Sequence, residues 1–210
     1  GELLGLPFAY RDARNAPAMK RVIRKLGEKK IYDATGIQFM PINSLYQLLA
    51  LARQQSPVLE AATRLLTIPD LLNFWLSGHA TNEFSNATTT QCYNPRTGDW
   101  AWELIERVGL PRRIFGGPII PPGTVLGPVR PALAAELGLG HTPVIAPATH
   151  DTGSAVAAVP FGAEPAIYLS SGTWSLMGVE VTAPVITDLS LTYNFTNEGG
   201  VGGTFRLLKN

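Results

Sequence analysis

The chain has 210 residues, enough to bury a sizeable core in one or two domains. Its 21 glycines and 17 prolines stay below the roughly 25–30 % that marks a low-complexity chain, which excludes a disordered protein. A net charge of +1 without a basic cluster argues against a nucleic-acid surface, and no apolar run approaches the roughly 18 residues of a membrane span.

Cysteine and histidine are scarce. Cys92 is the only cysteine, so the chain has no internal disulfide, which fits a reducing compartment. The three histidines, His79, His141 and His150, lie far apart without zinc-ligand spacing, so we expect no residue of this chain to form a metal centre. Because the chain starts without methionine and stops directly after a strand-like run, we expect a fragment of a longer protein.

The first half of the chain predicts helices, after a strand end and a turn in residues 1–10. Apolar residues at helical spacing predict a helix between Asn15, as its cap, and Gly27. The same pattern predicts helices from about residue 44 to before Pro57 and over 69–76, and one over 101–108 capped by Asp99. Residues 81–90, rich in Thr and Asn, are predicted to form a loop.

The second half changes character. Residues 114–129 carry four prolines and four glycines and predict a linker or a rigid surface loop, followed by a short helix over 131–138. An apolar run over 143–148 precedes a helix of small residues over 150–159. Residues 166–181 and 191–208 are strand-like with glycine turns. We therefore place a boundary between a mostly helical part and a mostly β part near residues 160–164.

The segment T-P-V-I-A-P-A-T-H-D-T-G-S-A-V, residues 142–156, carries the strongest indication of a ligand site. It predicts a strand, a tight turn and a helix, and α/β folds place ligands where a strand ends and a helix begins. Asp151 falls at the predicted helix N-terminus, where the helix dipole and free N–H groups favour the ionised carboxylate. From spacing alone, Asp151 is either a functional carboxylate or only a helix cap.

Two further segments place glycine turns between strand-like halves. Y-L-S-S-G-T-W-S, residues 168–175, offers hydroxyl and N–H groups that can cradle phosphate oxygens, although such hairpin turns are also common structural features. N-E-G-G-V-G-G, residues 197–203, predicts a hairpin tip.

Two alternative site chemistries find little support. A Walker A motif is absent, which argues against a P-loop nucleotide site in this chain. A hydrolase that joins His150 and Asp151 with Ser154 or Ser171 is disfavoured, because adjacent His and Asp side chains diverge and no G-x-S-x-G elbow is present.

A series of ordered motifs carries a family resemblance. They are G-L-P-F-A-Y-R-D-A-R (5–14), T-G-I-Q-F-M-P-I-N-S-L-Y-Q-L (35–48), S-N-A-T-T-T-Q (85–91), T-H-D-T-G-S-A-V (149–156), Y-L-S-S-G-T-W-S-L-M-G (168–178), and T-N-E-G-G (196–200) with L-L-K-N (207–210). In these motifs the whole chain resembles the FGGY carbohydrate kinases. I-Q-F, N-A-T-T-T-Q, S-S-G-T-W-S-L-M-G and T-N-E-G-G are typical of the branch that phosphorylates L-rhamnulose, whereas xylulose and glycerol kinases share only the general layout.

The resemblance implies an α/β fold of the actin-like, ribonuclease H-like ATPase type, with two domains and a sugar and ATP meeting between them. This chain would be only a fragment of it. Residues 1–161 would form the later part of the N-terminal sugar-binding domain, and residues 162–210 the opening β-hairpins of the C-terminal ATP-binding domain. The family's early phosphate-binding turn and its adenosine pocket are not among these segments, so the fragment alone is expected to be inactive.

The resemblance also implies an activity: transfer of phosphate from ATP, with Mg²⁺, to L-rhamnulose in rhamnose catabolism in the bacterial cytoplasm. Two alternatives remain. The chain could belong to a kinase of the same family that acts on another ketose, such as xylulose or fuculose, or it could be a non-catalytic sugar-binding relic. The family's catalytic base matches Asp151, sugar contacts match His150, Thr152 and Asn210, and an ATP contact matches Thr173. Residues 10–14 and Asn86 match family motifs without an assigned contact, and Arg11 and Asp12 could form an ion pair.

Overall fold

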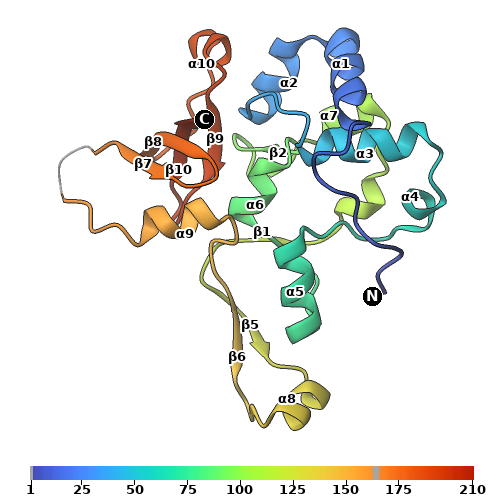
Figure 1. The fold of residues 1–210 in the computed structure, drawn as a ribbon, viewed down its shortest axis with the longest axis vertical. Coiled ribbons are helices and arrows are strands. Elements are labelled where there is room, and N and C mark those ends of the chain that lie inside the picture. Colours follow the sequence, from blue (N-terminus) through green and yellow to red (C-terminus); the bar gives the residue numbers. More distant parts are fainter. Residues whose placement is uncertain (1, 163–165) are drawn as a thin grey trace.

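The computed structural model describes residues 2–162 and 166–210 (Figure 1). Helices make up most of the first 115 residues, a hairpin arm projects from them, and a small antiparallel sheet lies beside them at the C-terminal end. None of the helices in the described residues has the length and apolar character needed to cross a bilayer.

The helical part begins with five consecutive helices and continues with shorter helices and two-residue strands. Its helices are α1 (Asn15–Leu26), α2 (Glu28–Thr35), α3 (Ser44–Arg53), α4 (Pro57–Ala61), α5 (Ile68–Ser77), α6 (Phe84–Thr89), α7 (Trp102–Val108) and the 3₁₀ helix η1 (Arg112–Phe115). Its strands are β1 (Asn82–Glu83), β2 (Tyr93–Asn94), β3 (Asp99–Trp100) and β4 (Ile119–Ile120). Strand β1 pairs in parallel with β4, and β2 pairs antiparallel with β3.

The helices predicted from apolar periodicity are confirmed as α1, α3, α5 and α7. Two of their predicted caps are wrong. Asn15 is the first residue of α1 rather than its cap, and its amide donates a hydrogen bond to the Tyr10 carbonyl (3.0 Å). Asp99 belongs to β3, where its carboxylate accepts hydrogen bonds from Trp100 N (2.7 Å) and Trp102 Nε1 (2.9 Å).

The structure differs from two further expectations. The segment 81–90 is not a loop but contains β1 and α6, and the buried Glu83 carboxylate caps α6. Residues 2–10 contain no strand. Helices α2 and α4 were not predicted, because each is short and lacks a long apolar stripe.

The main hydrophobic core joins the helical part. Its buried members come mainly from α1 to α4, α6, α7, η1 and the strands β2 and β3, and Trp100 packs edge-on against Phe115 with ring centroids 5.1 Å apart. Burial of such apolar surface is the dominant stabilising term in folding.

The arm consists of β5 (Thr124–Pro128) and β6 (Pro143–Ala146), which pair antiparallel, with α8 (Pro131–Leu137) at its tip (Figure 1). The predicted short helix over 131–138 is thereby confirmed. A small second core lies within the arm and includes Leu126, Ala134 and Val144. The proline- and glycine-rich segment 114–129 is ordered by this pairing and by β4.

The C-terminal part is an antiparallel sheet in the order β7 (Tyr168–Ser171), β8 (Ser175–Val181), β10 (Phe205–Lys209), β9 (Thr196–Gly199). Helix α9 (Asp151–Ala157) packs on it through a third core of Val156, Tyr168 and Leu208, and α10 (Asp188–Thr192) lies between β8 and β9 in the chain. The predicted boundary near residues 160–164 runs into residues 163–165, which lie outside the described residues, so this division stays a prediction.

Candidate active site

A pocket of about 480 Å³ lies where the helical part faces the C-terminal sheet. The loop after α2, the start of α9, the β7–β8 turn, β9 and the chain end line it. Its lining includes Gln38, Met40, Ile42, His150, Asp151, Thr152, Thr173, Trp174, Glu198 and Asn210. The five residues singled out in the sequence, His150, Asp151, Thr152, Thr173 and Asn210, therefore share one pocket.

Asp151 begins α9, and His150 is the cap of that helix. The Asp151 side chain is 98 % exposed. Its Oδ1 accepts hydrogen bonds from Thr152 N (2.6 Å) and Thr152 Oγ1 (3.3 Å), and Oδ2 has no hydrogen-bond partner among the described residues. The carboxylate is thus oriented by its neighbour while one oxygen faces open space.

The turn that carries Asp151 is fixed by the buried carboxylate of Glu83. Glu83 Oε2 accepts hydrogen bonds from Thr149 N (2.9 Å), Thr149 Oγ1 (2.7 Å) and Ser85 Oγ, and Oε1 accepts one from Ser85 N (2.9 Å). Ser85 Oγ in turn accepts a hydrogen bond from His150 N (3.0 Å). Residues 149 and 150 are therefore held against the N-terminus of α6.

A buried ionic cluster lies behind the pocket. The Arg206 side chain is fully buried, donates from Nη2 to Glu198 Oε2 (3.1 Å) and from Nε to the Gly199 carbonyl (3.1 Å). Arg206 Nη2 also lies 3.4 Å from His150 Nδ1, and His150 Nε2 lies 3.7 Å from Glu198 Oε2. One arginine thereby orients two residues of the pocket wall.

The β7–β8 turn forms the opposite wall. Gly172 N donates to the Trp174 carbonyl (2.8 Å), Ser171 Oγ lies 3.1 Å from Ser175 Oγ, and Thr173 is exposed. Arg11 stacks over the Trp174 ring with its Cζ 5.5 Å from the ring centroid, so the N-terminal segment reaches this wall. Asp12 pairs with Arg14 (3.8 Å), which differs from the alternative that pairs it with Arg11.

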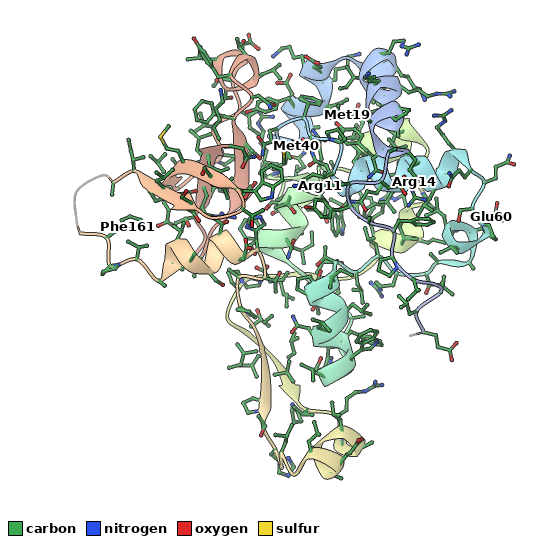
Figure 2. The ribbon with its side chains drawn as sticks, viewed as in Figure 1. Arg11, Arg14, Met19, Met40, Glu60 and Phe161 are labelled. Atoms are coloured by element: carbon green, nitrogen blue, oxygen red, sulfur yellow. The ribbon has the colours of Figure 1, made fainter. Side chains whose placement is uncertain are left out.

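Asn210, the last residue of the sequence, also lines the pocket. Asn210 Nδ2 donates to Met40 Sδ (3.7 Å), which joins β10 to the loop that follows α2. Figure 2 shows Met40 on the side of the helical part that faces the sheet.

Sequence reasoning missed several residues of this site. Gln38 and Glu198 lie in quoted motifs, but neither was given a role, and Glu83 was placed in a predicted loop. Arg206 carried no signal beyond a charge in a strand-like run. A charged residue flanked by apolar residues in a strand, as Arg206 is by Phe205 and Leu207, is a usable signal, because buried charges are nearly always paired.

The chain's own metal-binding capacity is small. No three His, Cys, Asp or Glu side chains gather in a metal-binding arrangement within residues 2–162 and 166–210. Of the two pocket carboxylates, Glu198 is paired with Arg206, which leaves Asp151. One free carboxylate fits a magnesium ion only where other oxygen donors, such as phosphate groups and water, supply most of its ligands.

A larger groove of about 920 Å³ runs along α1 and gathers five basic side chains, Lys20, Arg21, Arg24, Lys25 and Arg53, which differs from the expectation that the chain has no basic cluster. Its lining has no carboxylate, histidine, serine or threonine side chain to perform acid–base or nucleophilic chemistry. The pocket around Asp151 combines a histidine, carboxylates and hydroxyl groups, so it is the candidate active site.

Comparison with known proteins bears on this site. Residues 2–158 match the family model "FGGY family of carbohydrate kinases, N-terminal domain". The chain is 50 % identical over 202 residues to a protein named rhamnulokinase from Oceanobacillus iheyensis, covering 96 % of this chain and 42 % of that protein. It is 48 % identical to the rhamnulokinase of Bacteroides thetaiotaomicron, covering all of this chain and 43 % of that protein. The chain thus spans about two fifths of the length of these curated relatives.

Solved structures show the fold. A xylulose kinase from Lactobacillus acidophilus, with ligand bound, has a TM-score of 0.82 at 20 % identity, over 99 % of this chain and 41 % of its own. Plasmodium falciparum glycerol kinase with ADP has a TM-score of 0.78 at 14 % identity, over 98 % of this chain and 42 % of its own. The expected fold class, an α/β fragment of the actin-like ATPase type, is confirmed, and the chain belongs to the FGGY family of carbohydrate kinases.

Proposed function

We propose that this chain is part of an ATP-dependent kinase that converts L-rhamnulose to L-rhamnulose 1-phosphate in rhamnose catabolism in the cytoplasm. Relatives named rhamnulokinase at 50 % and 48 % identity support the substrate. The observation that carries the proposal is the meeting of His150, Asp151, Thr152, Thr173 and Asn210 in one pocket.

In this proposal Asp151 is the general base. Asp151 takes the proton from the primary hydroxyl of the ketose as that oxygen bonds to the γ-phosphorus of ATP, and ADP leaves with the electrons of the broken P–O bond. A carboxylate suffices as the base, because the transition state of phosphoryl transfer is loose and the hydroxyl proton leaves late. The exposed carboxylate, with Oδ2 unoccupied by the described residues, supports this role.

Other residues of the pocket would bind the sugar and the phosphate groups. His150, Thr152 and Asn210 would bind ketose hydroxyls, and the Thr173 turn would offer its hydroxyl and N–H groups to phosphate oxygens. Mg²⁺ bound to ATP oxygens would neutralise phosphate charge. Residues 1–161 would belong to the sugar-binding domain and residues 162–210 to the start of the ATP-binding domain. Closure of the two domains over the substrates would exclude water from the active site.

The test uses the longest natural polypeptide that contains this chain, called the parent polypeptide below. ADP release is measured with L-rhamnulose, L-fuculose, D-xylulose and glycerol, beside the 210-residue chain alone. We expect turnover on L-rhamnulose by the parent polypeptide and none by the 210-residue chain.

Each other outcome has a definite meaning. Turnover on another ketose only would keep the kinase and overturn the L-rhamnulose assignment. Ketose binding without turnover on any substrate would favour a sugar-binding relic. Turnover by the 210-residue chain would contradict its expected inactivity.

A further inference from the structure

The buried cluster of Arg206, Glu198 and His150 determines where the imidazole proton of His150 sits. A guanidinium can only donate hydrogen bonds, so the 3.4 Å contact between Arg206 Nη2 and His150 Nδ1 favours the tautomer in which Nδ1 is the acceptor. Asp151 Oδ1 lies farther from Nδ1, at 3.8 Å. The remaining ring proton is then on Nε2. Arg206 is fully buried and is bound to Glu198 and to the Gly199 carbonyl, so this arrangement is held by the core of the sheet.

The protonated Nε2 of His150 faces the carboxylate of Glu198, but the two do not form a good hydrogen bond. Their separation of 3.7 Å exceeds the 2.7–3.2 Å typical of N–H···O bonds. Glu198 and His150 both line the pocket, and the side chain of His150 is 24 % exposed while that of Glu198 is 9 % exposed. The pocket wall therefore presents a fixed donor beside a fixed acceptor.

A hydroxyl group complements this pair, because it donates one hydrogen bond and accepts others. Its oxygen can lie about 2.8 Å from both Nε2 and the carboxylate oxygen, accept from the imidazole and donate to the carboxylate. A carbonyl oxygen could use only the imidazole, and an ammonium group only the carboxylate. A methylene group would leave both groups desolvated without a partner, which is unfavourable.

We infer that Glu198 is a further substrate-binding residue, which together with His150 bridges one non-reacting hydroxyl of the ketose and so selects for its presence. Arg206 is a positioning residue for this pair. The inference rests on the proposed function only in taking the ligand to be a ketose. A site built to bind a hydroxyl discriminates strongly against an analogue that lacks it.

The experiment is a cycle of protein variants and substrate analogues, measured on the parent polypeptide. The ketose and a set of analogues, each lacking one non-reacting hydroxyl, are compared in the wild type, Glu198→Gln and His150→Asn. Glu136→Gln, on the exposed surface of α8, is the matched control. Both kcat/KM and ketose affinity by calorimetry without ATP are recorded.

We expect one analogue to lose about 10- to 100-fold in affinity and kcat/KM in the wild type, since a hydrogen bond to a charged group is removed. Glu198→Gln should lower the affinity and kcat/KM for the native ketose by a similar factor. In this variant, that one analogue should bind and react nearly as well as the native ketose. His150→Asn should identify the same hydroxyl. The KM for ATP should stay unchanged, and Glu136→Gln should behave as the wild type.

The inference is overturned if Glu198→Gln binds the native ketose normally, or if every analogue loses the same factor in the variant and the wild type. It is also overturned if the two variants identify different hydroxyls. If Glu198→Gln does not fold, the result with His150→Asn decides. The inference then requires that removing one particular hydroxyl from the ketose no longer lowers affinity in His150→Asn. Ketose affinity is measured without ATP, so it is independent of turnover. If the wild type binds the ketose but shows no turnover, the kinase activity is rejected and the roles of Glu198 and His150 are still tested. If the wild type does not bind the ketose, both the proposed function and this inference are rejected.

Discussion

Three carboxylates near the pocket differ in how they are bound, and this difference separates their roles. Glu83 is buried and accepts hydrogen bonds from Ser85 and Thr149. Glu198 is paired with the buried Arg206. Only Asp151 combines an exposed side chain with an oxygen that the described residues leave without a partner. A base must be able to accept a proton from substrate, and the positive charge of Arg206 opposes protonation of Glu198, so the proposed base is Asp151.

The first prediction concerns Asp151→Asn in the parent polypeptide. The amide can keep the hydrogen bond from Thr152 N through its oxygen but cannot take a proton, so kcat should fall about 10²- to 10⁴-fold while the KM for the ketose changes little. Steady-state kinetics with both substrates measure the effect.

The control is Asp188→Asn, which removes only an exposed ion pair with Lys29. It should leave kcat unchanged. A near-normal kcat in Asp151→Asn would show that another group accepts the proton or that the chemistry needs no base.

Helices that are specified by their own sequence pattern could be predicted, whereas helices that depend on tertiary contacts could not. Helices α1 and α3 follow from apolar residues repeated at helical spacing. Helix α6 has no such stripe. Its N-terminus is capped by the buried Glu83, and its side chains pack against β9, so its stability comes from residues far along the chain. That is why Thr- and Asn-rich residues 81–90 predicted a loop.

The contact between α6 and β9 leads to a second prediction. A Cβ atom at Gly199 would lie 2.7 Å from Phe84 Cε1 and 3.0 Å from Ser85 Cα, and Gly199 N donates to Thr88 Oγ1 (2.8 Å). Gly199→Ala should therefore push β9 away from α6 and lower the free energy of unfolding by about 1–3 kcal/mol. Urea unfolding measures this loss.

Gly162→Ala is the matched control, because an added Cβ there would meet no heavy atom within 4 Å. If both variants unfold at the same urea concentration as the wild type, the α6–β9 contact is looser than this structure shows.

The whole molecule explains why the site could be predicted only in part. His150, Asp151 and Thr152 are neighbours in sequence, so their grouping was assured. Their meeting with Thr173 and Asn210 requires the order β7–β8–β10–β9, which brings the end of β10 beside the loop after α2. Motif resemblance supplied those two residues, whereas the roles of Arg206 and Glu198 depend on pairing between strands.

The largest core gives a last prediction, on whether these 210 residues fold by themselves. Cys92, the only cysteine, is fully buried in that core, and burial raises the pKa of its thiol to about 12. Only the thiolate reacts with iodoacetamide. In a folded chain at neutral pH, alkylation must wait for opening of the core, because reagent is excluded and a thiol with a raised pKa stays protonated there. We expect the alkylation rate to be roughly a thousandfold or more lower than in urea, given ordinary domain stabilities.

A double variant, Cys92→Ser with Glu136→Cys, is the control. It places the thiol on the exposed surface of α8 and should react at similar rates with and without urea. Equal rates for the wild-type chain with and without urea would show that its cores do not suffice to hold it folded.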